Sequence, residues 1–286
     1  MIKVLKAGFY STIQDLGRIG VQQFGVPYSG VMDRKAASFA NALVGNNEGE
    51  AVLEMTMMGA QLEFKTPTCI AISGAHMSPM LNGILIENNH VVRVEMGDVL
   101  RFGKLLSGFR CYLAVSGGFK TETVMGSKSM YPNITKANKV VKNDIIKIEP
   151  TNRLNEGKHA KIRFNGAYIT SNVLEVFEGP EFEYLSINQR DELFSALFTI
   201  SNNSNRMGYQ LVETIQNDLK PIITGPVIPG TVQLTPSGKL IVLMRDCQTT
   251  GGYPRVLQLS EASINVLSQK FTGQSVFFQL KSMISV

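Results

Sequence analysis

The amino-acid sequence predicts a mainly β protein with a few helices. Short runs of apolar and β-branched residues make up most of the 286 residues, and Gly, Pro, Asn or Asp separates them. That pattern is typical of β-barrels and β-sandwiches. Regular alternation of strands with helices is missing, which argues against a doubly wound α/β fold. A hydrophobic content of 44% is ample for a sizeable core, in one large domain or in two.

The strand candidates are short and rich in residues that favour extended backbone. One of them, Leu240–Met244, is almost wholly apolar, which predicts a central strand buried on both faces. In chain order the candidates are Gln61–Phe64, Cys69–Ser73, Val91–Glu95, Val99–Phe102, Cys111–Val115, Ile145–Ile148, Lys161–Phe164, Leu174–Phe177, Thr231–Leu234, Leu240–Met244, Val256–Leu259 and Val276–Leu280.

The first predicted helix is Asp33–Val44. Its alanines and the two apolar residues near its end fall on one face, and Gly45 follows as a C-terminal glycine. Asp33 is placed as an N-cap, because a side-chain oxygen there can accept a free backbone N–H of the first turn. The cap is the favoured interpretation of Asp33, with a catalytic carboxylate as the alternative.

Two further helices are predicted in the second half of the chain. In Asn188–Phe198, Asn188 with Asp191 resembles a capping box, and an apolar stripe follows. Glu261–Phe271 is expected as a helix near the end of the sequence.

A polar segment, 150-PTNRLNEGKHA-160, is the best linker in the chain. A shift of 159 residues aligns Glu54 with Glu213, and both halves then read as a helix, Asn, Gly and a strand that ends in Glu. We therefore expect two similar half-domains, 1–150 and 160–286, each a β-barrel with a helix over it.

Composition argues against several classes of function. The net charge of +5 comes from scattered Lys and Arg, so no nucleic-acid partner is expected. No apolar stretch reaches the length of a membrane helix and no signal-peptide core is visible, so a cytoplasmic protein without a membrane partner is expected. The three cysteines are far apart, which suggests a reducing compartment. The three histidines lack metal-ligand spacing, so no metal is expected.

The polar decapeptide Arg245–Pro254 connects two strand candidates and is longer than such a connection needs. Its Gln and Thr side chains are neutral groups that both donate and accept hydrogen bonds. They suit a ligand in which an N–H lies beside a C=O, while the two glycines permit close backbone approach. A loop whose polar groups only cap the end of the barrel is the equally weighted alternative.

Three other stretches carry polar side chains of interest. Residues 11–34 include four glycines, and a structureless segment of that length is usually functional or disordered. In 201–213, Arg206 could clamp a carboxylate or a phosphate, although a helix exit with a surface arginine is the simpler interpretation. In 229–240, the turn Thr235–Gly238 predicts a hairpin that leads into the next strand. Glu54 and Glu213 could be an acid/base pair or two solvated residues.

Eight strings in this order resemble the allophanate hydrolase subunit 2 family, also called the biotin-dependent carboxyltransferase-like family. They span nearly the whole chain, and their combined length makes the match specific. The resemblance implies a pair of cyclophilin-like β-barrel subdomains. The strings are Thr12–Arg18, Gly25–Pro27, Ser29–Asp33, Asn41–Asn46, Arg206–Tyr209, Pro229–Gln233, Pro236–Gly238 and Gln248–Pro254.

The resemblance implies three alternative functions. The first is a subunit of an ATP-dependent 5-oxoprolinase, which opens a lactam to glutamate with an allophanate hydrolase subunit 1-type partner and a third, lactam-hydrolysing subunit. The second is a non-enzymatic regulator of the Kip antagonist type, which binds an inhibitor of a histidine kinase. The third is half of a biotin-dependent carboxyltransferase that uses carboxyl-biotin on urea or a similar amide. In the first, ATP is bound by the complex.

Residue chemistry suggests roles within this resemblance. Phosphorylation of an amide oxygen by ATP would require charge clamps and a carboxylate that manages protons. We therefore expect catalytic roles for Asp246, Arg206 and Asp33. The expected substrate-binding residues are Gln248, Thr249, Thr250, Tyr253, Gln14, Arg18 and Tyr209.

Overall fold

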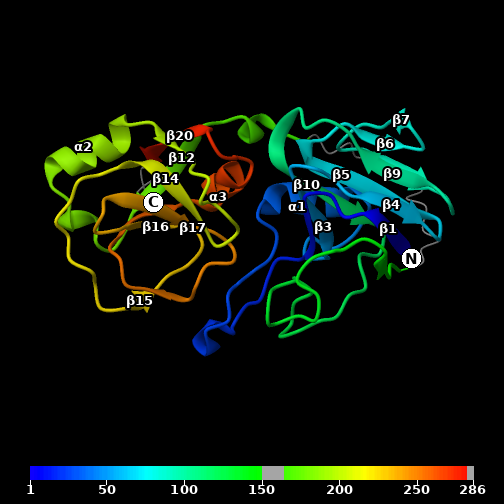
Figure 1. Cartoon of the computed structure of the whole chain (residues 1–286), viewed down its shortest axis with the longest axis horizontal. Coiled ribbons are helices and arrows are strands. Elements are labelled where there is room, and N and C mark those ends of the chain that lie inside the picture. The colour runs from blue at the N-terminus through cyan, green and yellow to red at the C-terminus, as the bar shows by residue number, and fades with distance from the viewer. Residues whose placement is uncertain (150–163, 282–286) are drawn as a thin grey trace, which may run out of the picture. The chain divides into compact units, whose positions relative to one another are not determined.

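The computed structural model describes residues 1–149 and 164–281 of the chain (Figure 1). Strands dominate the described residues and helices are few, so the predicted mainly β fold is confirmed. None of the helices in the described part has both the length and the apolar character that crossing a bilayer requires.

Internal contacts divide the described chain into two compact units. Unit 1 takes its residues from 1–18 and 29–170, and unit 2 takes its residues from 19–28 and from 171 onward. The boundaries 1–150 and 160–286 stay a prediction, because the linker 150–160 lies outside the described residues.

Unit 1 contains two antiparallel sheets around an apolar core. The six-stranded sheet has the order β11-β1-β4-β9-β6-β7, and the five-stranded sheet has the order β2-β3-β10-β5-β8. Alternate side chains of most of these strands point into the core, among them the fully buried Ile2, Leu53 and Phe64. The strands are β1 Ile2–Lys6, β2 Tyr10–Gln14, β3 Val52–Thr56, β4 Gln61–Phe64, β5 Thr68–His76, β6 Pro79–Leu81, β7 Ile84–Leu85, β8 Val91–Val94, β9 Val99–Phe102, β10 Ser107–Val115 and β11 Ile145–Ile146.

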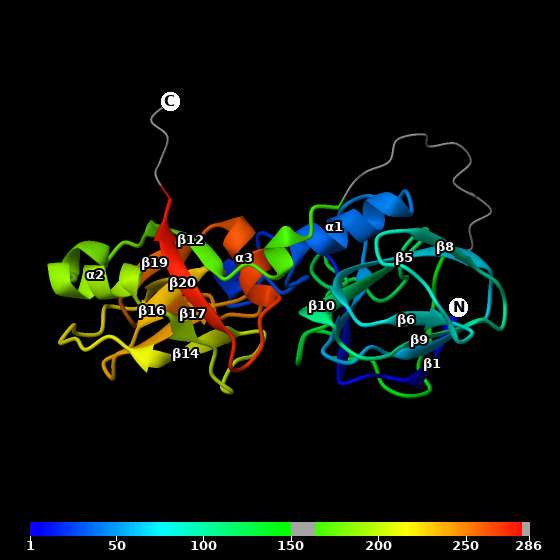
Figure 2. The same cartoon turned by 90° about the horizontal axis from the view of Figure 1, so that it is seen from above.

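Helix α1 (Arg34–Leu43) packs on the other face of the five-stranded sheet, against β5 and β10 (Figure 2). The buried face of α1 is made of alanines, which let the helix approach Ala71 and Ala114 of the sheet closely. Asp33 is the N-cap, and its Oδ1 accepts the Ala36 N–H at 3.0 Å. The predicted helix and its cap are therefore confirmed.

Unit 2 is built on one sheet that closes on itself. Its order is β13-β20-β12-β19-β16-β17-β14, and the two edge strands meet where Ile200 bridges to Leu211. The Ser201 N–H also donates to the Gln210 carbonyl at 2.9 Å, so the unit is a β-barrel. The strands are β12 Val173–Glu178, β13 Phe198–Thr199, β14 Gly208–Thr214, β16 Thr231–Leu234, β17 Lys239–Leu243, β19 Arg255–Leu259 and β20 Ser275–Leu280, with a separate two-stranded ribbon of β15 Gly225–Pro226 and β18 Thr250–Gly251.

The α-helices of unit 2 pack on the barrel wall, α2 (Ile187–Ser195) against β20 and α3 (Glu261–Ser268) against β12. The predicted capping box of α2 was wrong. Ser186 and Gln189 form it, because the helix is capped two residues earlier than the apolar stripe suggested. Short 3-10 helices lie at η1 Gln22–Phe24, η2 Ala167–Ile169 and η3 Phe182–Tyr184.

The decapeptide Arg245–Pro254 is long because of strand order. It leaves β17 and returns into β19, but β16 lies between those two strands in the sheet. The loop therefore crosses the end of β16, a gap of about 10 Å at the usual strand spacing. The predicted hairpin Thr235–Gly238 is confirmed, because it joins β16 to β17 in antiparallel register.

Some strands escaped prediction because polar residues interrupt their apolar alternation. The segment 11–34 begins inside β2, and 201–213 holds most of β14 rather than only a helix exit. In both strands the polar side chains find partners inside the fold, which sequence periodicity cannot show. The candidate strand Lys161–Phe164 lies outside the described residues except for its last residue.

Candidate functional site

The backbone of the decapeptide is held by its neighbours in unit 2. The Val227 N–H donates to the Thr249 carbonyl, the Ile222 N–H to the Gly252 carbonyl and the Leu234 N–H to the Pro254 carbonyl, each at 3.0 Å. Its first half also bonds back to the strand end, through the Cys247 N–H and the Met244 carbonyl. Backbone groups thus hold much of the loop in place.

The neutral side chains predicted to bind substrate reach the surface of unit 2. Gln248 and Thr250 are exposed, Thr249 is half-buried, and 39% of the Tyr253 surface is accessible. Within the described chain, the side chains of Gln248 and the two threonines form no hydrogen bond that would seal the barrel end. Their amide and hydroxyl groups can therefore donate to and accept from a bound molecule.

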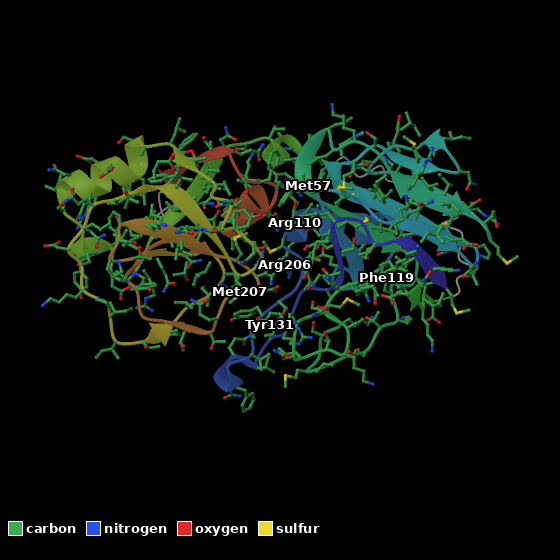
Figure 3. All side chains as sticks on the ribbon, viewed as in Figure 1. Met57, Arg110, Phe119, Tyr131, Arg206 and Met207 are labelled. Carbon is green, nitrogen blue, oxygen red and sulfur yellow. The ribbon has the colours of Figure 1, made fainter. Side chains whose placement is uncertain are left out.

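Arg206 and Asp246 form a bidentate ion pair beside this loop. Arg206 lies just before β14 (Figure 3), and its Nε donates to Asp246 Oδ2 at 2.7 Å while Nη2 donates to Oδ1 at 2.9 Å. The side chains are only 8% and 10% exposed. The predicted anion clamp therefore holds a carboxylate of its own chain, which fixes the start of the loop against β14.

The other side chains at the start of the loop are not nucleophiles. Burial, together with the charge of Asp246, raises the pKa of the Cys247 thiol to about 12, so the thiol stays protonated. Arg245 is buried and donates through Nη1 and Nη2 to Glu261, the first residue of α3. The chemistry available here is hydrogen bonding and charge placement rather than covalent attack.

Tyr209 lies inside the barrel of unit 2. Its side chain is 2% exposed and its hydroxyl donates to the Lys270 carbonyl at 3.2 Å. Contact of Tyr209 with a substrate stays a prediction.

In unit 1, polar side chains cover part of the five-stranded sheet. Cross-strand register places Thr12, Glu54, Tyr112 and Ser73 in one row on the face that carries α1. All four are buried. We call this row the polar sheet face. Beyond it, Arg110 (labelled in Figure 3) lies with its Nε 3.8 Å from a Glu54 oxygen. A row of buried polar groups is costly, which favours a role beyond packing.

Asp33 joins the polar sheet face to the N-terminus of α1. Its backbone N–H donates to the Tyr112 hydroxyl at 2.8 Å, and its Oδ2 accepts the Tyr168 hydroxyl at 2.7 Å. Burial, followed by the charges of Glu54 and Asp33, raises the pKa of Tyr112, and burial and the Asp33 charge raise the pKa of Tyr168. Both phenols therefore stay protonated at neutral pH.

Gln14 and Arg18 are bound by their own chain. The Gln14 amide donates to the Met130 carbonyl and accepts the Gly30 N–H, both at 3.1 Å, and Arg18 Nη2 donates to the Ser129 carbonyl at 2.6 Å. Both side chains are fully buried. They hold loops of unit 1 together, and their contact with a ligand stays a prediction.

Sequence reasoning missed Arg110, Tyr112 and Tyr168 in unit 1 and Gln233 in unit 2. Arg110 and Tyr112 stand in a strand that is otherwise apolar, and a charge inside such a run was the signal available. Gln233 sits in β16, where all four residues are buried. Tyr168 comes shortly after the linker, and nothing in the sequence around it indicates its contact with Asp33.

A family model described as the carboxyltransferase domain, subdomain A and B, matches residues 24–280 of the chain. Among named proteins, the C subunit of 5-oxoprolinase from Escherichia coli (strain K12) is 32% identical over 282 residues. That alignment covers 97% of this chain and 90% of the E. coli protein.

Solved structures with the same architecture are longer than this chain. The crystal structure of TTHA0988 has a TM-score of 0.86 and 25% identity, and the match covers 97% of this chain and 55% of that one. The crystal structure of the Kluyveromyces lactis urea carboxylase has a TM-score of 0.87 and 26% identity, with 98% and 27% covered. The chain thus spans about half of the first structure and about a quarter of the second.

Proposed function

The chain belongs to the family of the carboxyltransferase domain, subdomain A and B, and from this premise we propose that it is a subunit of an ATP-dependent 5-oxoprolinase. The observation that carries the proposal is the similarity to the C subunit of the E. coli 5-oxoprolinase, which extends over 97% of this chain and 90% of that protein. The strings that predicted the family lie largely within the matched residues.

The proposed reaction is the opening of the 5-oxoproline lactam to glutamate. The ring C–N bond breaks, the carbonyl carbon gains an oxygen from water and becomes a carboxylate, and the nitrogen becomes the free amine. Hydrolysis of ATP to ADP and phosphate accompanies the step. The energy is needed because resonance makes an amide carbonyl a poor electrophile.

The exposed Gln248 side chain fits one edge of such a lactam. A primary amide offers an N–H donor beside a C=O acceptor, and a lactam offers the complementary pair. Two parallel hydrogen bonds can therefore form, while the Thr249 and Thr250 hydroxyls and the Tyr253 ring border the same loop. We assign these four residues to substrate recognition.

The Arg206–Asp246 pair positions the decapeptide Arg245–Pro254, which we call the recognition loop. Asp246 lies two residues before Gln248, and Arg206 donates to both of its oxygens. We propose Asp246 as the carboxylate that manages protons at the loop and Arg206 as the residue that orients it. A role of Asp33 as a second carboxylate is proposed within unit 1, where Tyr168 and the α1 backbone bind its two oxygens.

ATP does not fit the helix N-termini of the described chain. Phosphate sites at such ends need uncapped N–H groups. Here Asp33 caps α1 with a carboxylate, and Ser260 caps α3 next to Glu261. Ser186 and Gln189 close the start of α2. We therefore assign nucleotide binding to the complex and route no step of this chain's chemistry through ATP.

The proposal requires partner subunits. The E. coli relative is by name one subunit of its enzyme. We propose an allophanate hydrolase subunit 1-type partner and a third, lactam-hydrolysing subunit for this chain.

The decisive experiment is to co-express the chain with these two partners and to measure phosphate release with and without 5-oxoproline. We expect release to rise with 5-oxoproline, and an intact complex without stimulation would reject the proposal. Gln248→Ala should abolish the stimulation and leave the melting temperature within a few degrees. Gln216→Ala, another exposed glutamine of unit 2, is the matched control and should change neither.

Half of a biotin-dependent carboxyltransferase is the second candidate, favoured by the K. lactis urea carboxylase structure. The same loop would then face the ureido ring of carboxyl-biotin, which supplies the carboxyl group. Carboxyl transfer to urea by a complex that contains a biotin carrier, with no response to 5-oxoproline, would select this candidate. Binding of a kinase inhibitor without any turnover would select the regulator.

A further inference from the structure

Beneath the recognition loop lies a buried amide that has no hydrogen-bond partner. Gln233 projects from β16, its side chain is 2% exposed, and its Nε2 forms no hydrogen bond with any residue that the structure describes. A buried N–H donor without an acceptor costs about 1–3 kcal/mol. An unsatisfied group of this kind calls for an explanation, and an acceptor on a bound molecule is one that the position beside the loop favours.

An acceptor from a bound molecule would reach Gln233 Nε2 from the side of Gly251. A Cβ atom on Gly251 would lie 2.3 Å from Gln233 Nε2 and 3.2 Å from Val227. The glycine therefore gives the Gln233 amide access to the loop backbone, where any larger residue would displace it. Gly251 stands between the exposed Thr250 and the half-buried Gly252, in the middle of the loop that carries Gln248 and Tyr253.

A short ribbon covers Gln233. Gly251 belongs to β18, which pairs with β15 through two residue pairs, Gly225 with Gly251 and Pro226 with Thr250. The backbone bonds from the Val227 and Ile222 N–H groups to the loop also hold it there. One N–H of that ribbon is missing, because Pro226 has none. A ribbon this short is marginally stable alone, so it can shift by a small distance while the barrel stays closed.

A register shift in the strand pairing at Gln233 also affects the direction of its side chain. The pairing of β16 with β19 changes register between Val232 and Gln233. Register shifts of this kind redirect side chains and are common next to functional sites.

We propose that Gln233 is a specificity-determining residue that donates its Nε2–H to the carbonyl oxygen of an amide-containing substrate once the β15–β18 ribbon shifts. The inference rests on the proposed function for its substrate class, a lactam or ureido group. Gln248 would then bind the ligand from the solvent side and Gln233 from the barrel side. An ester lacks the N–H that donates to Gln248, and a C–OH group lacks the carbonyl oxygen that accepts from Gln233. Each analogue therefore loses a contact that the amide makes.

Gln233→Met tests the assignment, because methionine keeps the length of the side chain and removes the unpartnered donor. We expect the melting temperature to stay unchanged or to rise by a few degrees, since an unsatisfied buried group is removed. We expect the apparent affinity of the complex for 5-oxoproline to fall by about tenfold to a hundredfold. A melting temperature that falls, or an affinity that does not, would overturn the assignment.

The matched control is Gln258→Met on the neighbouring strand β19. Gln258 makes the bonds that Gln233 lacks: its Nε2 donates to the Pro229 carbonyl at 3.0 Å, and its Oε1 accepts the Thr231 hydroxyl at 2.9 Å. This variant should lower the melting temperature and leave the affinity for 5-oxoproline unchanged. Equal behaviour of the two variants would show that Gln233 is only a structural residue.

An NMR measurement distinguishes a failure of this inference from a failure of the proposed function. In the complex with ¹⁵N-labelled chain, the side-chain NH₂ resonance of Gln233, assigned with Gln233→Met, should shift on addition of 5-oxoproline. If 5-oxoproline neither shifts it nor stimulates ATP hydrolysis, the proposed function fails, and urea and biotin are added next. A shift with either keeps Gln233 as the donor to an amide carbonyl. No shift with any of the three compounds rejects it.

Discussion

Individual residues of the candidate site divide into those that hold the loop and those that face outward. Arg206 and Asp246 were predicted to be catalytic because an arginine and a carboxylate are common catalytic groups. In the fold they form an ion pair with each other. Gln248, Thr250 and Tyr253 are chemically less conspicuous, yet they are exposed and available to a bound molecule.

Removing one member of the buried pair should be costly. Asp246→Ala leaves the Arg206 guanidinium buried without its counter-ion, and we expect a loss of about 3 kcal/mol in the free energy of unfolding. Denaturant titration of the purified chain measures it. The double variant Arg206→Met with Asp246→Leu should recover most of the loss, because an apolar pair carries no desolvation cost. A single variant as stable as the wild type would show that the pair does not hold the loop.

Among the elements, turns and caps were more predictable than strands that mix polar and apolar residues. Helix α1 followed from Asp33, the alanine face and Gly45, because a cap and a 3.6-residue period are local properties. The start of α2 was misplaced: Asn188 and Ser186 are both good caps, but only Ser186 is followed three residues later by the Gln that completes a capping box. Strands β2 and β14 carry buried polar residues whose partners lie far away in the sequence.

The β16–β17 hairpin depends on a glycine that can be tested against a matched position. Gly238 has φ +81°, and a Cβ there would lie 2.6 Å from the Ile215 carbonyl oxygen. Gly273 has φ +87° with no atom within 4 Å of such a Cβ. Gly273→Ala should lower the free energy of unfolding by about 1 kcal/mol from the left-handed backbone alone, and Gly238→Ala by clearly more. Equal losses of unfolding free energy in the two variants would mean that the hairpin backbone moves enough to accommodate the added methyl group.

At the scale of the whole molecule, the fold class followed from composition and punctuation. The recognition loop stood out in the sequence because its length and its neutral side chains are unusual together, and its contact with a substrate stays a prediction. The polar sheet face was not visible, because Thr12, Glu54, Tyr112 and Ser73 come from four strands and meet only through register. Gln233 was hidden for the same reason: burial without a partner is a property of the fold.

The stability of the chain in acid should depend on the Glu181–Arg255 pair. Hydrogen bonds from Arg255 hold the pKa of Glu181 below its ordinary value. A lowered pKa adds stability above the ordinary pKa of about 4.3, and this contribution is lost as pH falls through the pKa of the folded state. The wild type should therefore exceed Glu181→Gln in unfolding free energy at pH 7, and the gap should narrow below about pH 4. A gap independent of pH would contradict the assignment.

The order of β17, β16 and β19 also bears on how such a protein could be redesigned. Because the decapeptide must bridge an intervening strand, its span is imposed by the barrel whatever molecule it meets. Among its middle residues, Gly251 must stay a glycine beside Gln233, whereas Gln248 and Thr250 are exposed. Replacing the exposed residues at equal loop length should therefore leave the barrel intact and change which small molecules it can bind, whereas shortening the loop would pull two non-adjacent strands toward each other.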